Sequence, residues 1–197
     1  MAGVTARRYL GVPLLLAGLA GVGCKKDDGV AEAMNGARLL TEAYRDALQG
    51  KLTSALNDEG PAAAIRVCNV EAPAIGAKVL GGQREGWMIQ RTALRVRNPA
   101  NAPNEWQRRG LEALQERIER GTAPAAAEWH EVEEGALRYM RAIPLGGMCT
   151  LCHGDPESIP QEVKDELARL YPEDRAVGFS EGELRGAFVV TVPLGTR

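Results

Sequence analysis

The residues best suited to chemistry lie between positions 149 and 154, which read Cys-Thr-Leu-Cys-His-Gly. Two thiols at this spacing on a turn of helix can each bond one vinyl group of the same porphyrin, and the adjacent histidine can reach the iron from that side. A zinc site would require four ligands, but the sequence has only one C-x-x-C pair, with Cys68 and His130 far away. A thioredoxin-like pair would sit between a strand and a long helix, and the segments beside this motif do not fit that context. The motif therefore predicts one covalently attached haem c, with Cys149 and Cys152 as thioether cysteines and His153 as the proximal iron ligand.

Several other residues are candidates for the distal iron ligand, on the side opposite His153. The chain has four cysteines, and one, Cys68, is left over once Cys24 is assigned to lipid and the motif cysteines to haem. Cys68 falls on the apolar face of a predicted helix, one turn before Pro73, and is the favoured distal ligand. The alternatives are His130, one of the methionines (Met34, Met88 or Met140) and an open position.

The N-terminus has the pattern of an export signal. Arg7 and Arg8 precede an uncharged stretch from residue 9 to 23, and small residues lead into Cys24. The stretch is about 15 residues long, whereas a membrane-spanning helix needs about 20. We expect a signal peptide over 1–23, a lipidated Cys24 that anchors the protein to a membrane, a linker over 24–30, and a location on the periplasmic side of a bacterial membrane.

Composition narrows the function classes. The chain has 197 residues and a formal net charge of −2, which gives no long-range attraction for nucleic acid. Its length fits one domain, expected over 31–197. No nucleophile, base and orienting group are visible together, so nothing in the sequence favours an enzyme.

Hydrophobic spacing and turn residues predict an α+β fold in which N-terminal helices pack with a small antiparallel sheet around the haem. Helices are expected over 30–56, 61–80 with a break at Pro73, 104–120 and 160–171. Strands are expected over 90–96, 128–132, 136–143 and 184–192.

Three arginines invite a binding role. Arg91, Arg95 and Arg97 alternate along the predicted strand over 90–96 and its end, so all three should face the same side. A guanidinium can hold a haem propionate through paired hydrogen bonds, and Arg91 is the preferred candidate. The alternatives are a solvated charged face, or Arg97 pinning the loop at Asn98, while Asp174 is expected to brace its own loop.

Several segments carry a family resemblance. They read AIRVCNVEAPAI at 64–75, RTALRVRNPANAPN at 91–104, CTLCHG at 149–154, and YPEDRAVGF with a later EGELRGA within 171–187. Together they resemble the haem-c PAS-like sensor family, long catalogued as a domain of unknown function. The resemblance covers the whole predicted mature chain. It implies a PAS-like fold and a haem held between His153 and Cys68.

The resemblance also bears on function, because members of that family occur as small exported proteins or ahead of histidine kinases. We expect a low-potential sensor of redox state or of a small gas such as NO, CO or O2, with the output supplied by a partner. A periplasmic electron-transfer cytochrome c is the first alternative, and a haem peroxidase-like enzyme is the second.

Overall fold

The computed structural model describes residues 1, 3, 24–81 and 84–195, and only the backbone of residues 24–28. The predicted signal peptide therefore lies almost wholly outside the described residues, as does the side chain of Cys24. None of the described helices combines the length and the apolar composition that a membrane crossing requires.

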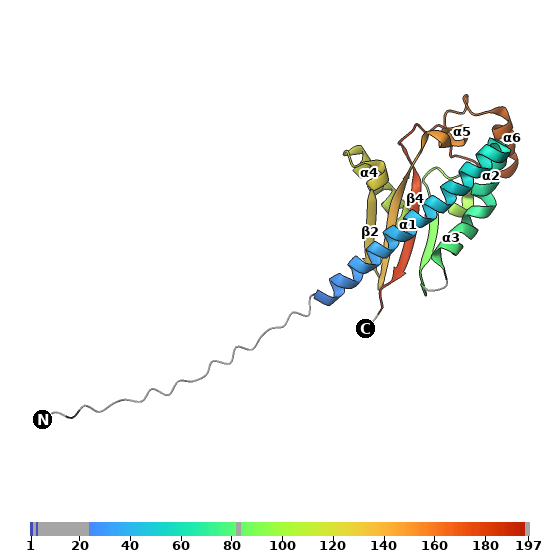
Figure 1. Ribbon diagram of the computed structural model, residues 1–197. Helices are drawn as coiled ribbons and strands as arrows, with labels where there is room; N and C mark the ends of the chain where they lie inside the picture. Colours follow the sequence, from blue (N-terminus) through green and yellow to red (C-terminus); the bar gives the residue numbers. More distant parts are fainter. Residues whose placement is uncertain (2, 4–23, 82–83, 196–197) are drawn as a thin grey trace.

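A four-stranded antiparallel sheet forms the centre of the fold (Figure 1). Its strands are β1 (Met88–Thr92), β2 (Glu128–Glu133), β3 (Ala136–Pro144) and β4 (Leu184–Pro193), in the order β1-β4-β3-β2. Glu134 and Gly135 both adopt positive φ and form the tight turn between β2 and β3. The predicted hairpin is confirmed, and the strand that comes last in the sequence, β4, lies inside the sheet.

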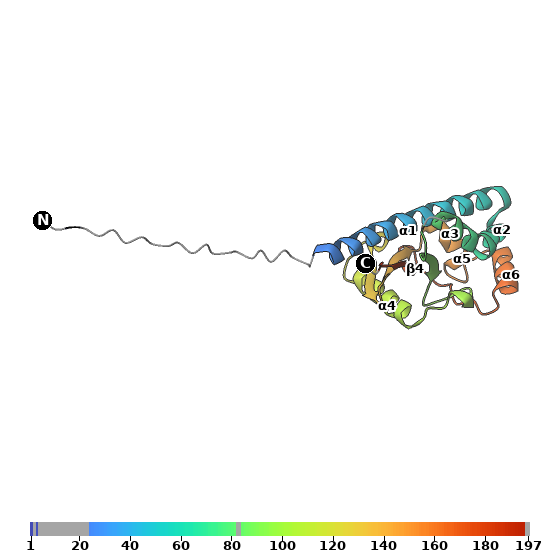
Figure 2. The same ribbon diagram turned by 90° about the horizontal axis from the view of Figure 1, so that it is seen from below.

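Helices cover both faces of the sheet, which makes three layers (Figure 2). The long helix α1 (Cys24–Glu59) packs its buried Ala37 and Leu40 against Tyr139 and Val190 of one face. Helix α4 (Glu105–Glu119) packs Leu111 and Leu114 on the other face, which Met140 and Val189 share. Helix α6 (Gln161–Leu170) buries Val163 and Leu167 in one apolar cluster with Ile65 of the short helix α2 (Pro61–Arg66). The predicted α+β fold is confirmed.

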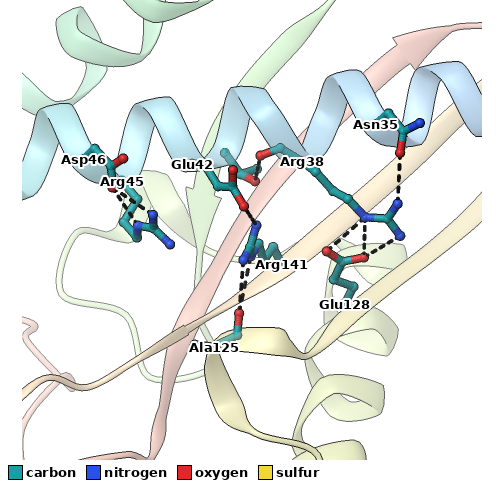
Figure 3. A network of polar contacts seen from close by, with 9 residues as sticks. Asn35, Arg38, Glu42, Arg45, Asp46, Ala125, Glu128 and Arg141 are labelled. Carbon is teal, nitrogen blue, oxygen red and sulfur yellow. Dashed lines mark hydrogen bonds and ion pairs between the residues drawn. The ribbon is translucent and has the colours of Figure 1, made fainter.

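Charged side chains fix α1 against the hairpin (Figure 3). Arg38 Nε donates to Glu128 Oε2 at 2.9 Å, and Arg141 Nη1 donates to Glu42 Oε1 at 2.8 Å. Arg141 also donates to the Ala125 carbonyl. Because the two ion pairs lie about one turn of α1 apart, they fix the position of the helix along the β2–β3 hairpin.

The second predicted helix is broken where its proline suggested. Helix α2 (Pro61–Arg66) continues into a π-helical turn, η1 (Val67–Glu71), and then into α3 (Ala72–Leu80). Pro73 lacks the N–H that would reach the Asn69 carbonyl, so regular α-helical bonding fails at this point. Tyr44 of α1 donates its hydroxyl hydrogen to the Ala72 carbonyl at 2.7 Å and supports the irregular turn.

One predicted strand has different limits. The strand expected over 90–96 starts at Met88 and ends at Thr92. The Thr92 hydroxyl donates to the Asn101 carbonyl at 2.9 Å and ties the chain to the 3-10 turn Pro99–Asn101 instead of the sheet. The helix predicted to open at 104 begins at Glu105, with Asn104 as its N-cap.

Candidate functional site

A cavity of about 310 Å³ lies where α1, α2, η1 and the ends of β1, β3 and β4 meet. This volume is at the lower end of the range for ligand pockets. Its wall contains Cys68, Cys149, Cys152, His153 and Arg91, so every residue predicted for the haem faces the same space. Segments distant in sequence are thus brought together as the motifs implied.

The histidine of the motif is held with one nitrogen engaged. His153 ends the short helix α5 (Thr150–His153), and its Nδ1 lies 2.6 Å from the Ala176 carbonyl oxygen. A carbonyl can only accept, so Nδ1 carries the proton and donates it, which leaves Nε2 with a free lone pair. Burial, and then Arg185 and Arg97, hold the pKa of His153 well below its usual range. The neutral imidazole is the form that ligates iron.

A buried ion pair supports this histidine. Arg97 Nε donates to Asp174 Oδ2 at 2.9 Å, and these side chains are only 8% and 12% exposed. Arg97 also donates to the carbonyls of Cys152 and Ala176, while Asp174 Oδ1 accepts from the Ala176 N–H at 2.7 Å. The prediction that Asp174 braces its loop is confirmed. The idea that Arg97 pins the Asn98 loop is wrong, because Arg97 reaches the segment after the motif.

The three described cysteines line the cavity as free thiols. Cys68, Cys149 and Cys152 are half-buried and form no disulfide. Burial raises the pKa of the Cys149 thiol and raises that of Cys152 to about 11, so both are protonated at neutral pH. Cys68 sits on the π-helical turn η1, and the predicted inward orientation of Cys68 is confirmed by its place in the cavity wall.

The competing distal ligands lie elsewhere. His130 is exposed on β2, and Met88 is 60% exposed on β1. Met34 and Met140 are buried in the two apolar layers on opposite faces of the sheet. None of these four residues lines the cavity, whereas Cys68 does.

The arginines divide differently from the prediction. Only Arg91 belongs to β1, where it lines the cavity 5.9 Å from the centre of the Tyr44 ring. Arg95 lies beyond the strand and stacks 3.5 Å over Phe179, facing a second cavity between α4 and β4. The expected alternation of three arginines is wrong because the strand ends at Thr92.

One residue of the wall was missed by the sequence analysis. Arg185, at the start of β4, lines both cavities, and its Nε lies 3.2 Å from His153 Nδ1, a contact and not a hydrogen bond because Nδ1 already donates to Ala176. Its Nη1 donates to the Arg95 carbonyl at 3.2 Å. Burial lowers the pKa of Arg185 to about 10, with Arg97 adding to the effect, so the side chain stays a cation. Its position in the EGELRGA segment was the available signal.

The donors around the cavity suit a broad group better than a single ion. Within the described part of the chain, no three His, Cys, Asp or Glu side chains converge in the way a metal ion requires. The thiols and the imidazole instead occupy the wall of one cavity whose other lining is largely apolar, including Leu48, Leu52 and Phe188. This arrangement fits a planar apolar group with an iron at its centre.

Comparison with known proteins agrees with this architecture. A solved structure, described as the cyanobacterial heme-protein Tll0287, is similar with a TM-score of 0.57 and 23% sequence identity. The match covers 84% of this chain and 98% of that chain. No curated protein sequence matches. The model of the Tll0287-like family matches residues 25–193, and the chain therefore belongs to the Tll0287-like family.

Proposed function

We propose that this chain is an exported haem c protein that acts as a low-potential sensor of redox state or of a small gas. The observation that carries the proposal is the single cavity whose wall contains the C-x-x-C-H motif together with Cys68. Haem binding is further supported by the family, since a solved structure similar to this chain is described as a heme-protein.

Each site residue has a distinct role in this proposal. Cys149 and Cys152 would form the thioether bonds, His153 would bind iron through Nε2, and Cys68 would supply a second iron ligand as a thiolate. The bound group supplies one-electron redox chemistry and, where a position at the iron is open, binding of a diatomic gas. Arg97 donates to the carbonyls of Cys152 and Ala176, and these contacts hold His153 and its hydrogen-bond partner in place.

Cys68 is the residue suited to respond. A thiolate favours ferric over ferrous iron, so Cys68 would bind a reduced iron more weakly and would leave it more readily as a protonated thiol. Cys68 lies on a π-helical turn, a geometry that is frequent at functional sites and stores a local departure from regular bonding. Release of Cys68 would let this turn relax about Pro73, and that change of shape is what a partner protein could read.

A second candidate is electron transfer. Met148 and Leu151 flank the motif cysteines and are each 41% exposed, which provides an apolar surface beside the group where a redox partner could dock. The peroxidase-like alternative has less support, because the described cavity wall contains no carboxylate and no second imidazole to act as an acid or base.

Spectroscopy of Cys68→Ala tests the central claim. The wild type should show thiolate-type low-spin ferric absorption, and Cys68→Ala should lose this signature, gain carbon monoxide binding when reduced, and have a higher midpoint potential. Val70→Ala is the matched control, since Val70 lies on the same turn, is 69% exposed and does not line the cavity. An unchanged ferric spectrum in Cys68→Ala would exclude Cys68 as the distal ligand.

The location requires its own experiment. We propose that residues 1–23 direct export and that lipid on Cys24 anchors the protein on the periplasmic side of the membrane. Cys24→Ala should move the protein from the membrane fraction to the soluble fraction with its haem spectrum intact. Retention of the variant in the membrane fraction would refute the lipid anchor.

A further inference from the structure

We propose that Arg91 and Arg185 bind the two propionate carboxylates of the haem, and that Arg97 does not. The inference rests on the proposed haem function and adds the contacts that orient the group in its cavity.

Four arginines line the cavity, and two of them already have carboxylate partners. Arg97 pairs with Asp174 at 2.9 Å inside the protein, and Arg45 pairs with Asp46 at 2.9 Å near the surface. Arg91 and Arg185 have no carboxylate within 4.0 Å among the described residues. Two cations therefore face the cavity without a protein anion to balance them.

The contacts of these two arginines orient them without neutralising them. Arg91 lies over the Tyr44 ring, and Arg185 donates to a backbone carbonyl and lies 5.5 Å from the centre of the Phe179 ring. Uncompensated charge is costly in a partly buried site, so an anion in the cavity would stabilise both side chains. A guanidinium matches a carboxylate in particular, because two parallel N–H groups can bind both of its oxygens.

The backbone places the two arginines on adjacent strands at the same end of the sheet. Arg91 lies opposite Phe188 in the β1–β4 ladder, and Arg185 precedes Phe188 by three residues. That offset corresponds to roughly 10 Å along the strands, and the register shift at Arg185 in the β3–β4 pairing lets both side chains line the same cavity.

Formal charges support the pairing of two cations with two carboxylates. A ferric porphyrin core carries one positive charge, which a Cys68 thiolate balances. The two propionates carry two negative charges, which Arg91 and Arg185 balance, while the Arg97–Asp174 pair is neutral by itself. The occupied ferric cavity would then have no net charge, and one electron would make it negative. This excess charge would add to the tendency of the sulfur to leave.

Resonance Raman spectra of the haem-loaded protein test the inference, because the propionate bending bands respond to contacts with the carboxylates. Arg91→Gln and Arg185→Gln should each shift one propionate band, and the double variant should shift both. Each variant should also lower the midpoint potential, since a positive charge near the iron is removed. Arg91→Lys and Arg185→Lys keep the charge but lose the two-pronged contact, so their bands should lie between the wild-type and Gln positions.

Arg108→Gln is the matched control, because Arg108 is exposed on α4, forms no ion pair among the described residues and lies outside the cavity. Wild-type propionate bands in the double Gln variant would overturn the inference. If a Gln variant fails to accumulate, the Lys variants decide, and wild-type bands in both would overturn it as well. Intact mass separates this failure from that of the proposed function: a wild-type protein without covalent haem refutes the function, whereas haem with unshifted bands refutes only the arginine contacts.

Discussion

The wall of the cavity that carries His153 is held by buried polar contacts, whereas the wall that carries Cys68 is held by apolar packing around an irregular turn. On the first wall, the backbone N–H of Phe179 donates to the His153 carbonyl at 3.0 Å, and the Arg97–Asp174 pair fixes the neighbouring carbonyls. On the second wall, Ile65 and Val67 shortly before Cys68 are buried in two separate apolar clusters.

Polar contacts suit a side chain that must stay fixed, and apolar packing suits one that must move. Directional hydrogen bonds fix the angle of an imidazole ring, which a permanent ligand requires. Apolar packing constrains volume more than direction, so a short turn packed mainly through apolar side chains can rearrange at the loss of few directional contacts. We therefore expect the His153 wall to stay fixed and the Cys68 wall to move, and the following experiments test that contrast.

The largest effect should come from removing both motif thiols. Cys149→Ala with Cys152→Ala should abolish covalent haem attachment, because no thiol remains to bond the vinyl groups. Intact mass and acid-acetone extraction measure the loss, and Cys68→Ala is the control that should retain full covalent haem. Haem that resists extraction in the double variant would show that attachment uses another residue.

The buried ion pair should dominate the stability of the His153 wall. Asp174→Asn leaves Arg97 as an unpaired buried cation and should lower the free energy of unfolding by about 3 kcal/mol. Glu59→Gln is the control from the Cys68 wall, because the Glu59–Arg66 pair is more than half exposed and should contribute less than about 1 kcal/mol. Urea titrations of both variants measure the free energy of unfolding. Equal decreases in Asp174→Asn and Glu59→Gln would contradict the expected difference between the two walls.

A methyl group tests how tightly the motif turn is packed. A Cβ at position 154 would lie 2.6 Å from the Thr150 carbonyl oxygen, so Gly154→Ala should cost about 2 kcal/mol. Gly50→Ala is the control, since nothing lies within 4 Å of its added Cβ and alanine should favour helix α1 by about 0.5–1 kcal/mol. Thermal unfolding should move in opposite directions for the two variants, and a stable Gly154→Ala would mean that the turn can shift.

The smallest effect concerns the polar contact between α1 and the Cys68 wall. Tyr44→Phe removes the hydrogen bond to the Ala72 carbonyl and should cost about 1 kcal/mol. Amide hydrogen exchange should accelerate over 67–72 and stay unchanged over 150–153, because only the first segment, at Ala72, loses a contact. Equal acceleration in both segments would show that the two walls open as one unit.

Sequence reasoning was most successful where the information is local. The C-x-x-C-H spacing, the Pro73 break and the Glu134–Gly135 turn each depend on a few neighbouring residues, and the structure places all of them as expected. Cys68 was reached by elimination among four cysteines, and its place in the cavity wall fits that reasoning. The helix and strand order followed from periodicity and turn residues.

The contacts that sequence reasoning missed join segments that are distant in the sequence. Arg97 meets Asp174 across 77 positions, and no local pattern distinguishes this pair from surface charges. Arg185 became part of the site because β4 enters the sheet beside β1, a pairing that the sequence did not specify. The end of β1 at Thr92 likewise depends on a hydrogen bond to Asn101.

The position of β4 also determines when the cavity can close during folding. In the sheet, β1 has β4 as its neighbour, and β4 is the last strand to be synthesised. Until β4 pairs with β1 and β3, neither Arg185 nor Phe188 can complete the wall. Pairing between such distant segments is slow compared with helix formation. Cys149 and Cys152 are therefore accessible until β4 inserts, which leaves an interval in which a bulky planar group could enter before the wall is complete.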